Sequence, residues 1–257
     1  MTSQDIASGS SIRKHLSYTT ENTGDHYYRM TLSKIVEKLQ SEGIFTGGPP
    51  QLFESAGRLQ LSTLVREGLY PSSRLLDIGC GCLRAGYWLV RLLDVGCYYG
   101  IEPNAKMLQA GIDYVIGPEL QTAKKPSFAT NDRYDFSVFG VKFDAFLARS
   151  VWTHAPKSQI QTMLDGFVQH STPDAFFLTS YYPARWFKRG SWDYRGANWR
   201  GRSHLSTKPD QVCHKLSWIE AQCRSRGLFL REVDEPPFNG QHWLMLSRKA
   251  RAPRTAT

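Results

Sequence analysis

Residues 75–84 read LLDIGCGCLR, a short apolar run that passes into a Gly-x-Gly turn. The run Leu75–Ile78 is typical of a buried strand, and residues 83–93 follow a helical pattern. Glycines at 79 and 81 let the backbone bend sharply and approach a ligand, because no Cβ stands in the way. A helix that starts here offers free N–H groups in its first turn. The stretch therefore predicts a site for a nucleotide-like cofactor at the carboxyl edge of a parallel sheet.

The residues around this turn narrow the kind of cofactor. A dinucleotide fingerprint needs Gly or Ala where the chain has Arg84, and the Gly-Lys-Ser/Thr of a P-loop is absent from the sequence. Asp77 stands two residues before the first glycine, where a carboxylate suits an ammonium and a sulfonium charge better than a pyrophosphate. Glu102 ends the next apolar run and could accept hydrogen bonds from ribose hydroxyls.

Strand-like and helix-like segments alternate along the chain after residue 74. Helices are predicted over 83–93, 105–115, 158–170 and 208–226, and strands over 75–78, 97–102, 127–130, 143–151, 175–181, 228–233 and 242–247. This alternation predicts an α/β fold, with a Rossmann-like, mostly parallel seven-stranded sheet and helices on both faces.

The segments outside this core differ in composition. Residues 1–24 are rich in Ser, Thr and Gly, so we expect a flexible N-terminal tail. Apolar residues at helical spacing predict an N-terminal helical extension. We interpret residues 25–250 as one domain with a helical cover (25–69), a cofactor-binding core (74–181) and a lid or acceptor-binding insertion (182–208), followed by a basic tail (251–257).

The charge of the chain is distributed unevenly. The 257 residues include 32 basic and 23 acidic side chains, and residues 1–180 carry 17 of each. All of the net charge of +9 therefore lies in residues 181–257. A basic region can bind nucleic acid or an anionic small molecule, and it can also be a solvated face without a partner.

Several classes of protein are excluded by the same composition. The five cysteines fit no zinc spacing, so we expect no metal and a reduced, cytoplasmic protein. No run approaches 18 apolar residues, which argues against a membrane partner. The first eleven residues, MTSQDIASGSS, lack the apolar core of a signal peptide. The oligomeric state is not indicated.

Together these segments resemble a known family. Residues 74–181 look like the core of class I S-adenosylmethionine-dependent methyltransferases. Residues 77–81 resemble the first motif of that family and residues 100–103 its second, while residues 143–154 are similar to its fourth strand. Residues 240–244 resemble its reversed last strand. One departure is Leu83, where the family often has a third glycine.

The resemblance implies S-adenosylmethionine as the cofactor. It implies that Asp77 lies near the amino-acid end of the cofactor and Glu102 at its ribose. Asp132 stands where the family often contacts the adenine amino group, although it could equally cap a loop. The full set of cofactor-binding residues implied is Asp77, Gly79, Cys80, Gly81, Glu102, Pro103, Asp132, Arg149 and Ser150.

The function that follows is methyl transfer to an oxygen or nitrogen of a small-molecule acceptor, anionic or aromatic in character. His154, just past the predicted fourth strand, is the candidate general base, although it could also simply pack beside the cofactor. Residues 184–202 interleave aromatic and basic side chains, which suit an acceptor pocket, a patch on the core or nucleic acid. An RNA or protein methyltransferase and a non-catalytic cofactor-binding protein are the alternatives.

Overall fold

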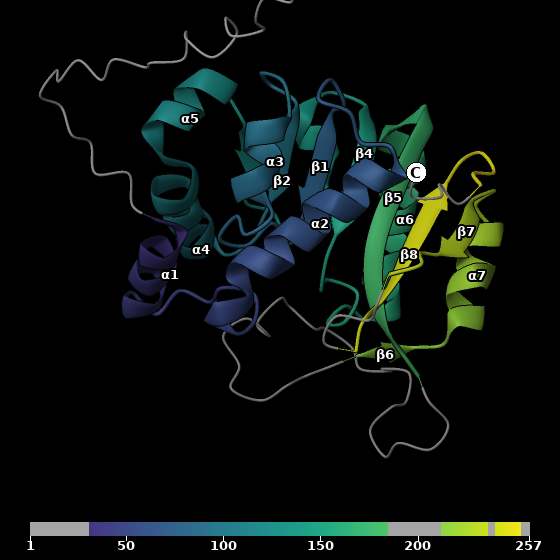
Figure 1. The fold of residues 1–257 in the computed structure, drawn as a ribbon. Helices are drawn as coiled ribbons and strands as arrows, with labels where there is room; N and C mark the ends of the chain where they lie inside the picture. The colour runs from purple at the N-terminus through teal and green to yellow at the C-terminus, as the bar shows by residue number, and fades with distance from the viewer. Residues whose placement is uncertain (1–30, 185–211, 236–239, 253–257) are drawn as a thin grey trace, which may run out of the picture. The chain divides into compact units, whose positions relative to one another are not determined.

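The computed structural model describes residues 31–184, 212–235 and 240–252, which all belong to one compact unit (Figure 1). The predicted sheet is confirmed, and its strands follow the order β3-β2-β1-β4-β5-β8-β7. The strands of this path are β1 (Leu75–Ile78), β2 (Tyr98–Ile101), β3 (Ser127–Ala129), β4 (Phe143–Ala148), β5 (Ser171–Pro183), β7 (Phe229–Glu232) and β8 (His242–Ser247). The predictions for residues 1–24, for 185–208 and for the last five residues lie outside the described part of the chain.

The pairing of the strands agrees with the predicted topology. β1 pairs in parallel with β2 on one side and with β4 on the other. β8 is antiparallel to both of its neighbours, β5 and β7, so the last strand is reversed. The predicted fourth strand is three residues too long, because Ser150 has a left-handed backbone (φ 61°) that strand pairing does not accept.

A short strand that the sequence did not predict lies off this path. β6 (Cys213–His214) pairs in parallel with the end of β5. The helix predicted over 208–226 is therefore wrong at its start, since α7 spans only Leu216–Arg224. The physical reason is a tertiary pairing: the amide of Ala184 donates to the carbonyl of His214, which holds this part of the chain extended.

Helices cover both faces of the sheet. The helices are α1 (Leu32–Ser41), α2 (Phe53–Glu67), α3 (Gly86–Leu92), α4 (Ala105–Ala110), α5 (Gly117–Lys124), α6 (Lys157–His170) and α7, with a π-helical turn over Gly111–Ile116. α1 to α4 and the π-helical turn contribute to one apolar cluster, and α6 and α7 to the other. In Figure 1, α2 and α3 lie in front of the sheet and α6 behind it. None of the described helices is long and apolar enough to cross a membrane.

Neighbouring residues of each central strand point to opposite faces, as strand geometry requires. Leu75 and Leu147 enter the cluster under α2 and α3, while Leu76 and Phe146 enter the cluster under α6. All four side chains are fully buried. The continuous apolar run in each strand is therefore explained by a sheet that is covered on both sides.

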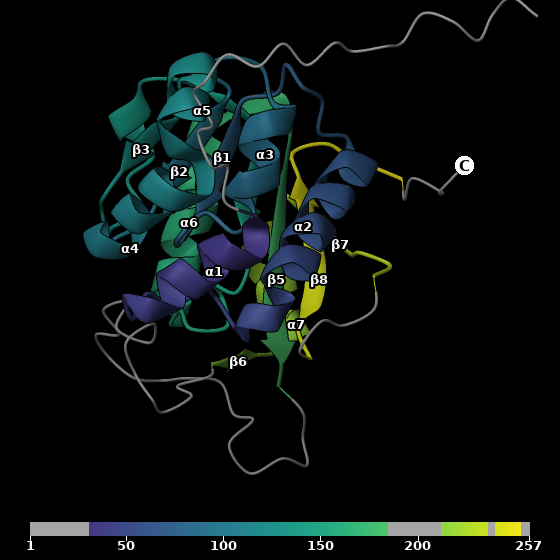
Figure 2. The same ribbon diagram turned by 60° about the vertical axis from the view of Figure 1, so that its left-hand side comes forward.

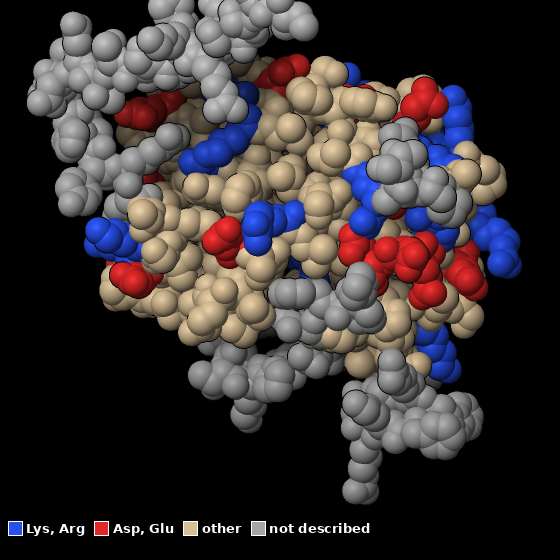
Figure 3. Space-filling model, viewed as in Figure 1, with Lys and Arg blue, Asp and Glu red and all other residues tan. Residues whose placement is uncertain are grey.

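The N-terminal helices contact elements at both edges of the sheet. α1 lies beside α4 in both views, and Tyr114 of the π-helical turn donates a hydrogen bond to Glu42 just after α1 (Figure 1, Figure 2). Ion pairs Arg66–Glu235 and Arg231–Glu67 join α2 to β7 and the residues that follow it. Figure 3 shows acidic and basic side chains gathered over this edge of the sheet.

Candidate functional site

A cleft opens where the carboxyl ends of β1 and β4 meet. β1 and β4 are neighbours in the sheet, but the chain leaves β1 towards β2 and β3 on the other side. Such a switch point is where open α/β sheets bind ligands. The cleft encloses about 940 Å³ of empty space, which includes the open solvent at its mouth. Of the predicted site residues, Asp77, Gly79, Cys80, Gly81, Arg149, Ser150 and His154 line it.

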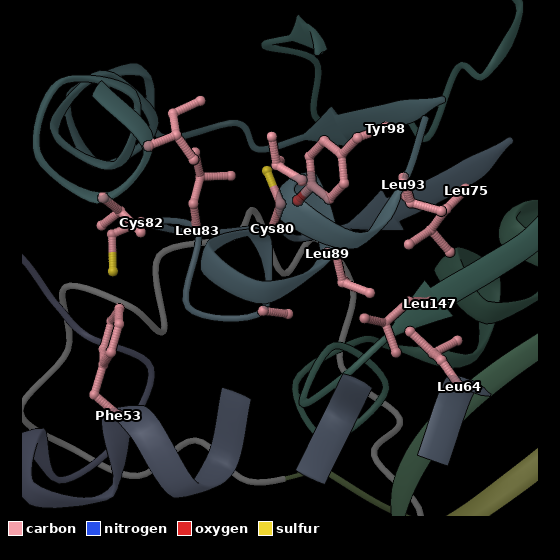
Figure 4. Packing of buried hydrophobic residues seen from close by; sticks show 14 of the residues in the cluster. Phe53, Leu64, Leu75, Cys80, Cys82, Leu83, Leu89, Leu93, Tyr98 and Leu147 are labelled. Carbon is pink, nitrogen blue, oxygen red and sulfur yellow. The ribbon is translucent and has the colours of Figure 1, made fainter. Parts of the chain in front are cut away.

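The loop after β1 has three residues with a left-handed backbone. They are Gly79 (φ 68°), Gly81 (φ 58°) and Leu83 (φ 63°). Position 83, where the resembling family often has glycine, thus keeps the conformation that favours glycine. Leu83 is fully buried between the loop and α3 (Figure 4). Burial of a leucine side chain stabilises by about 1.5–3 kcal/mol, enough to offset a left-handed penalty of about 1–2 kcal/mol.

Close backbone contacts fix the position of this loop. A Cβ on Gly79 would lie 2.7 Å from Cγ2 of Val151, and one on Gly111 would lie 2.6 Å from the carbonyl carbon of Cys82. A Cβ on Gly81 would meet nothing closer than Cε of Met107, at 3.9 Å. The loop after β1 therefore packs between the loop that follows β4 and the π-helical turn. Its open side faces the cleft.

We expect Gly111→Ala to weaken ligand binding in this cleft by about tenfold, because the added methyl group must push the Cys82 backbone aside. Gly166→Ala in α6 is the matched control, since its Cβ would lie equally close, 2.6 Å, to Cε2 of Phe136. Both variants should lose about 1–3 kcal/mol of stability. Calorimetric titration with the ligand proposed below measures the difference. Equal affinities in the two variants would contradict a positioning role for Gly111.

Asp77 is a buried carboxyl group on the cleft wall. It is 3% exposed, and the hydroxyl of Tyr98 donates a hydrogen bond of 2.7 Å to its Oδ2. Burial raises the pKa of Asp77 to about 7, although the hydrogen bond from Tyr98 lowers it. The charge of Glu102 raises the pKa further, while that of Arg84 lowers it. An ionised Asp77 therefore favours a cationic group beside it.

Glu102 directly follows β2, where the sequence placed it. Its side chain is fully buried and does not line the cleft. Oε2 accepts a hydrogen bond from the amide of Gly81 (3.1 Å), and Oε1 accepts one from the amide of Asn104 (2.9 Å). Glu102 thus ties the β1 loop to the turn after β2. Ribose binding by Glu102 stays a prediction.

Two further predicted residues also lie outside the cleft lining. Pro103 and Asp132 are both exposed, and neither lines the cleft. Pro103 stands in the turn between β2 and α4, and Asp132 follows β3 by three residues. Adenine contact by Asp132 therefore stays a prediction as well.

The opposite wall is a polar network that sequence analysis only partly identified. Nη1 of Arg149 donates to the hydroxyls of Ser150 (2.9 Å) and Ser180 (3.1 Å). Gln241 is hydrogen-bonded to both serines. Burial lowers the pKa of Arg149 to about 9, so the guanidinium is still a cation at neutral pH. Ser180 and Gln241 were not predicted as site residues, because only the pairing of β5 with β8 brings them here.

His154 lies in a turn that is held from outside the cleft. Nε2 of His214 is 3.1 Å from the carbonyl oxygens of Trp152 and Ala155, on either side of the turn. The amide of Val212 donates to Thr153 in the same turn. His214 is fully buried, and it was missed because a helix was expected to begin before it. The catalytic role of His154 remains a prediction, whereas its place on the cleft wall is clear.

The loop between α1 and α2 covers one side of the cleft. Residues 45–48 line it, as does Gln60 of α2. Nη1 of Arg84, next to the β1 loop, donates a 2.8 Å hydrogen bond to the carbonyl oxygen of Gly47. This contact joins the N-terminal helices to the glycine turn.

Comparisons with known proteins identify the fold. No protein-family model matches the chain, and no curated protein matches its sequence. The chain resembles the solved structure of magnesium protoporphyrin IX methyltransferase (ChlM) from Synechocystis PCC 6803 with bound S-adenosylmethionine. The TM-score is 0.57 at 18% identity, over 86% of this chain and 98% of that one.

Two other solved structures are similar. DesVI of Streptomyces venezuelae has a TM-score of 0.55 at 15% identity and covers 86% of this chain and 100% of its own. The glycopeptide N-methyltransferase MtfA has a TM-score of 0.54 at 12% identity and covers 77% of this chain and 90% of its own. The chain therefore has the fold of class I S-adenosylmethionine-dependent methyltransferases.

Proposed function

We propose that the protein binds S-adenosylmethionine in the cleft between β1 and β4 and transfers its methyl group to an oxygen or nitrogen of a small molecule. The observation that carries this proposal is the glycine turn at the switch point, with the buried Asp77 on the cleft wall. A carboxylate beside such a turn suits a ligand with positive charge. It would repel the pyrophosphate of a dinucleotide or of ATP.

The residues of the cleft fit this cofactor. Gly81 leaves its side of the loop open, so a ligand can contact the backbone there. Asp77 would bind the ammonium group at the amino-acid end. The loop and Glu102 are joined through the Gly81 amide, so a ribose near Glu102 would lie at the other end of the same loop.

The chain's own residues would act mainly by positioning. When bound, S-adenosylmethionine supplies a methyl group that is already activated on a sulfonium. The apolar lining residues Met107 and Val151 and the α1–α2 loop would exclude water, and the turn at 151–155 would hold His154 at the cleft wall. His154 would accept the proton of an acceptor hydroxyl or amine as a general base.

The small-molecule acceptor is supported by analogy and by the site. ChlM and MtfA are named for a porphyrin and a glycopeptide, respectively. The cationic Arg149 on the cleft wall is compatible with an anionic acceptor. We propose a cytoplasmic enzyme with no metal requirement, whose activity depends on positioning the acceptor opposite the glycine turn.

Titration calorimetry tests the cofactor. We expect saturable binding of S-adenosylmethionine and of its demethylated product, S-adenosylhomocysteine. ATP is the matched control ligand, because it shares the adenosine but carries phosphates in place of the amino acid. Binding of ATP with equal or greater affinity would overturn the assignment, and so would the absence of binding by both sulfur compounds.

The RNA alternative rests on the positive charge of residues 181–257. Binding to a mixed RNA pool at about 50 and about 200 mM salt separates the two acceptors, because six to ten phosphate contacts lose about a thousandfold or more over that range. We expect weak, non-specific binding. Tight binding with a steep salt dependence would favour RNA as the acceptor.

A further inference from the structure

Tyr98 of β2 reaches Asp77 of the neighbouring strand β1. In the register of β1 and β2, Tyr98 stands opposite Leu75 and Gly100 stands opposite Asp77. Residues two apart in a strand point to the same face, so Tyr98 and Gly100 share a face with Asp77. The ring of Tyr98 lies along the sheet beneath α3, and a Cβ on Gly86 of that helix would lie 3.2 Å from the Tyr98 hydroxyl. Its hydroxyl ends 2.7 Å from Oδ2 of Asp77.

The hydroxyl of Tyr98 is enclosed on all sides that the structure describes. Tyr98 is 2% exposed, and its ring packs against Phe128 with centroids 6.0 Å apart. A Cβ on Gly100 would lie 2.9 Å from the sulfur of Cys80 and 3.0 Å from the ring of Phe128, so no other residue fits there without movement. Figure 4 shows Tyr98 beside Cys80. Tyr98 is thus placed to act on Asp77 and not on a ligand.

Three groups on the elements around Asp77 affect its pKa, in addition to burial. The charge of Glu102 after β2 raises the pKa of Asp77, while that of Arg84 before α3 lowers it. The nearby thiol of Cys80 is neutral, because burial raises its pKa well above the ordinary value. Tyr98 supplies the hydrogen bond that favours the ionised carboxylate against the effect of burial. The pKa of Asp77 stands at about 7 under these opposing effects. At neutral pH and without a ligand, the Asp77 carboxyl group is therefore protonated in part of the molecules and ionised in the rest.

We propose that Tyr98 is a positioning residue of the cofactor site: its hydroxyl holds the Asp77 carboxyl group at the cleft wall and favours its ionised form, and an ammonium-bearing ligand releases the proton from the Asp77 carboxyl groups that still carry one. The inference rests on the proposed function in one respect: the ligand carries an α-ammonium group. The carboxyl O–H bond of Asp77 breaks, the proton passes to solvent, and the carboxylate pairs with the ammonium group.

The pH dependence of affinity follows from this exchange. Below about pH 7 the ligand must displace a proton, so its affinity should fall by up to about tenfold per pH unit. Above that pH the carboxylate is already ionised and the affinity should level off. Removal of the Tyr98 hydroxyl should raise the pKa of Asp77 further, so the pH above which the affinity levels off should also rise.

The test is calorimetric titration of the full-length protein with S-adenosylhomocysteine from about pH 5.5 to about pH 7.5. Two buffers with different ionisation enthalpies give the number of protons released. Tyr98→Phe keeps the ring and removes only the hydroxyl. Tyr99→Phe is the matched control, because Tyr99 is the next residue of β2 and packs on the opposite face against Phe139 and Phe143.

We expect the wild type and Tyr99→Phe to release a proton below pH 7 and to share one pH profile. Tyr98→Phe should bind S-adenosylhomocysteine about tenfold more weakly near pH 7, and its affinity should level off at a higher pH than that of the wild type. 5′-Methylthioadenosine, which lacks the amino acid, should bind all three proteins with no pH dependence. If a variant disturbed the loop after β1, it would bind 5′-methylthioadenosine more weakly as well, so this ligand separates a disturbed loop from a change at Asp77.

Two results would overturn the role of Tyr98. One is a Tyr98→Phe profile that runs parallel to the wild type, and the other is an equal loss of affinity for both ligands. Failure of the proposed function gives a different result, since no protein would then bind S-adenosylhomocysteine at any pH.

Discussion

Asp77→Asn should raise the melting temperature of the ligand-free protein and at the same time weaken binding of S-adenosylhomocysteine. The two effects have one origin. The carboxyl group is buried for the sake of a ligand, and its charge destabilises the fold when the ligand is absent. Asparagine has nearly the same shape and cannot ionise, and its amide oxygen can still accept the hydrogen bond from Tyr98.

The sign of the stability effect follows from the raised pKa. The pKa of Asp77 lies at about 7 in the folded protein and at 3.8 in its ordinary state. The folded state therefore holds the proton more tightly, so stability declines as pH rises between these values. Three pH units correspond to an upper limit of about 4 kcal/mol. At about pH 8 we expect Asp77→Asn to gain about 1–4 kcal/mol, or about 2–4 °C per kcal/mol in a chain of this size.

Thermal unfolding between about pH 4 and about pH 8 checks this prediction. The difference between variant and wild type should vanish towards pH 4, where Asp77 is protonated in both states. Affinity for S-adenosylhomocysteine should fall by about 1.5–3 kcal/mol near pH 8, because a charge-assisted hydrogen bond is lost. A variant that is less stable at every pH would show that Asp77 holds the fold together and is not reserved for a ligand.

The structure was predicted most accurately from the sequence where the local pattern and the tertiary structure agree. Residues 75–84 combine an apolar run with glycines, and both features act within a few residues of each other. The strand, the turn and the left-handed backbone at Gly79 and Gly81 were all within reach of such an argument. Leu83 could be flagged as a departure, but its burial beneath the loop depends on α3 and could only be seen in the fold.

The rest of the site depends on contacts between distant segments. His214 belongs to a two-residue strand with no periodicity to detect, and its role comes from carbonyl groups some 60 residues earlier. Gln241 meets Ser150 only because β8 runs antiparallel beside β5. Glu102 was correctly placed at the end of β2. Its two backbone hydrogen bonds were not predictable, because they depend on how the β1 loop folds back.

Gly81→Val should abolish binding of S-adenosylhomocysteine, with an affinity loss of at least about a hundredfold, which is about 2.7 kcal/mol. A side chain at position 81 has open space in front of it, since the nearest atom would be Cε of Met107 at 3.9 Å. The fold therefore accommodates the added atoms, and they occupy the part of the cleft where a ligand approaches the backbone. Calorimetry and thermal unfolding together measure the two effects.

Gly96→Val is the matched control for this variant. Gly96 also has a left-handed backbone (φ 73°) with nothing within 4 Å of its Cβ position, but it lies before β2, at the edge of the sheet away from the cleft. Both valines carry the same backbone strain, about 1–3 kcal/mol. The affinity loss of Gly81→Val minus that of Gly96→Val therefore measures the steric effect in the cleft. If Gly81→Val loses no more affinity than Gly96→Val, the ligand does not lie against the β1 loop, and the cofactor site must be sought elsewhere along the carboxyl edge of the sheet.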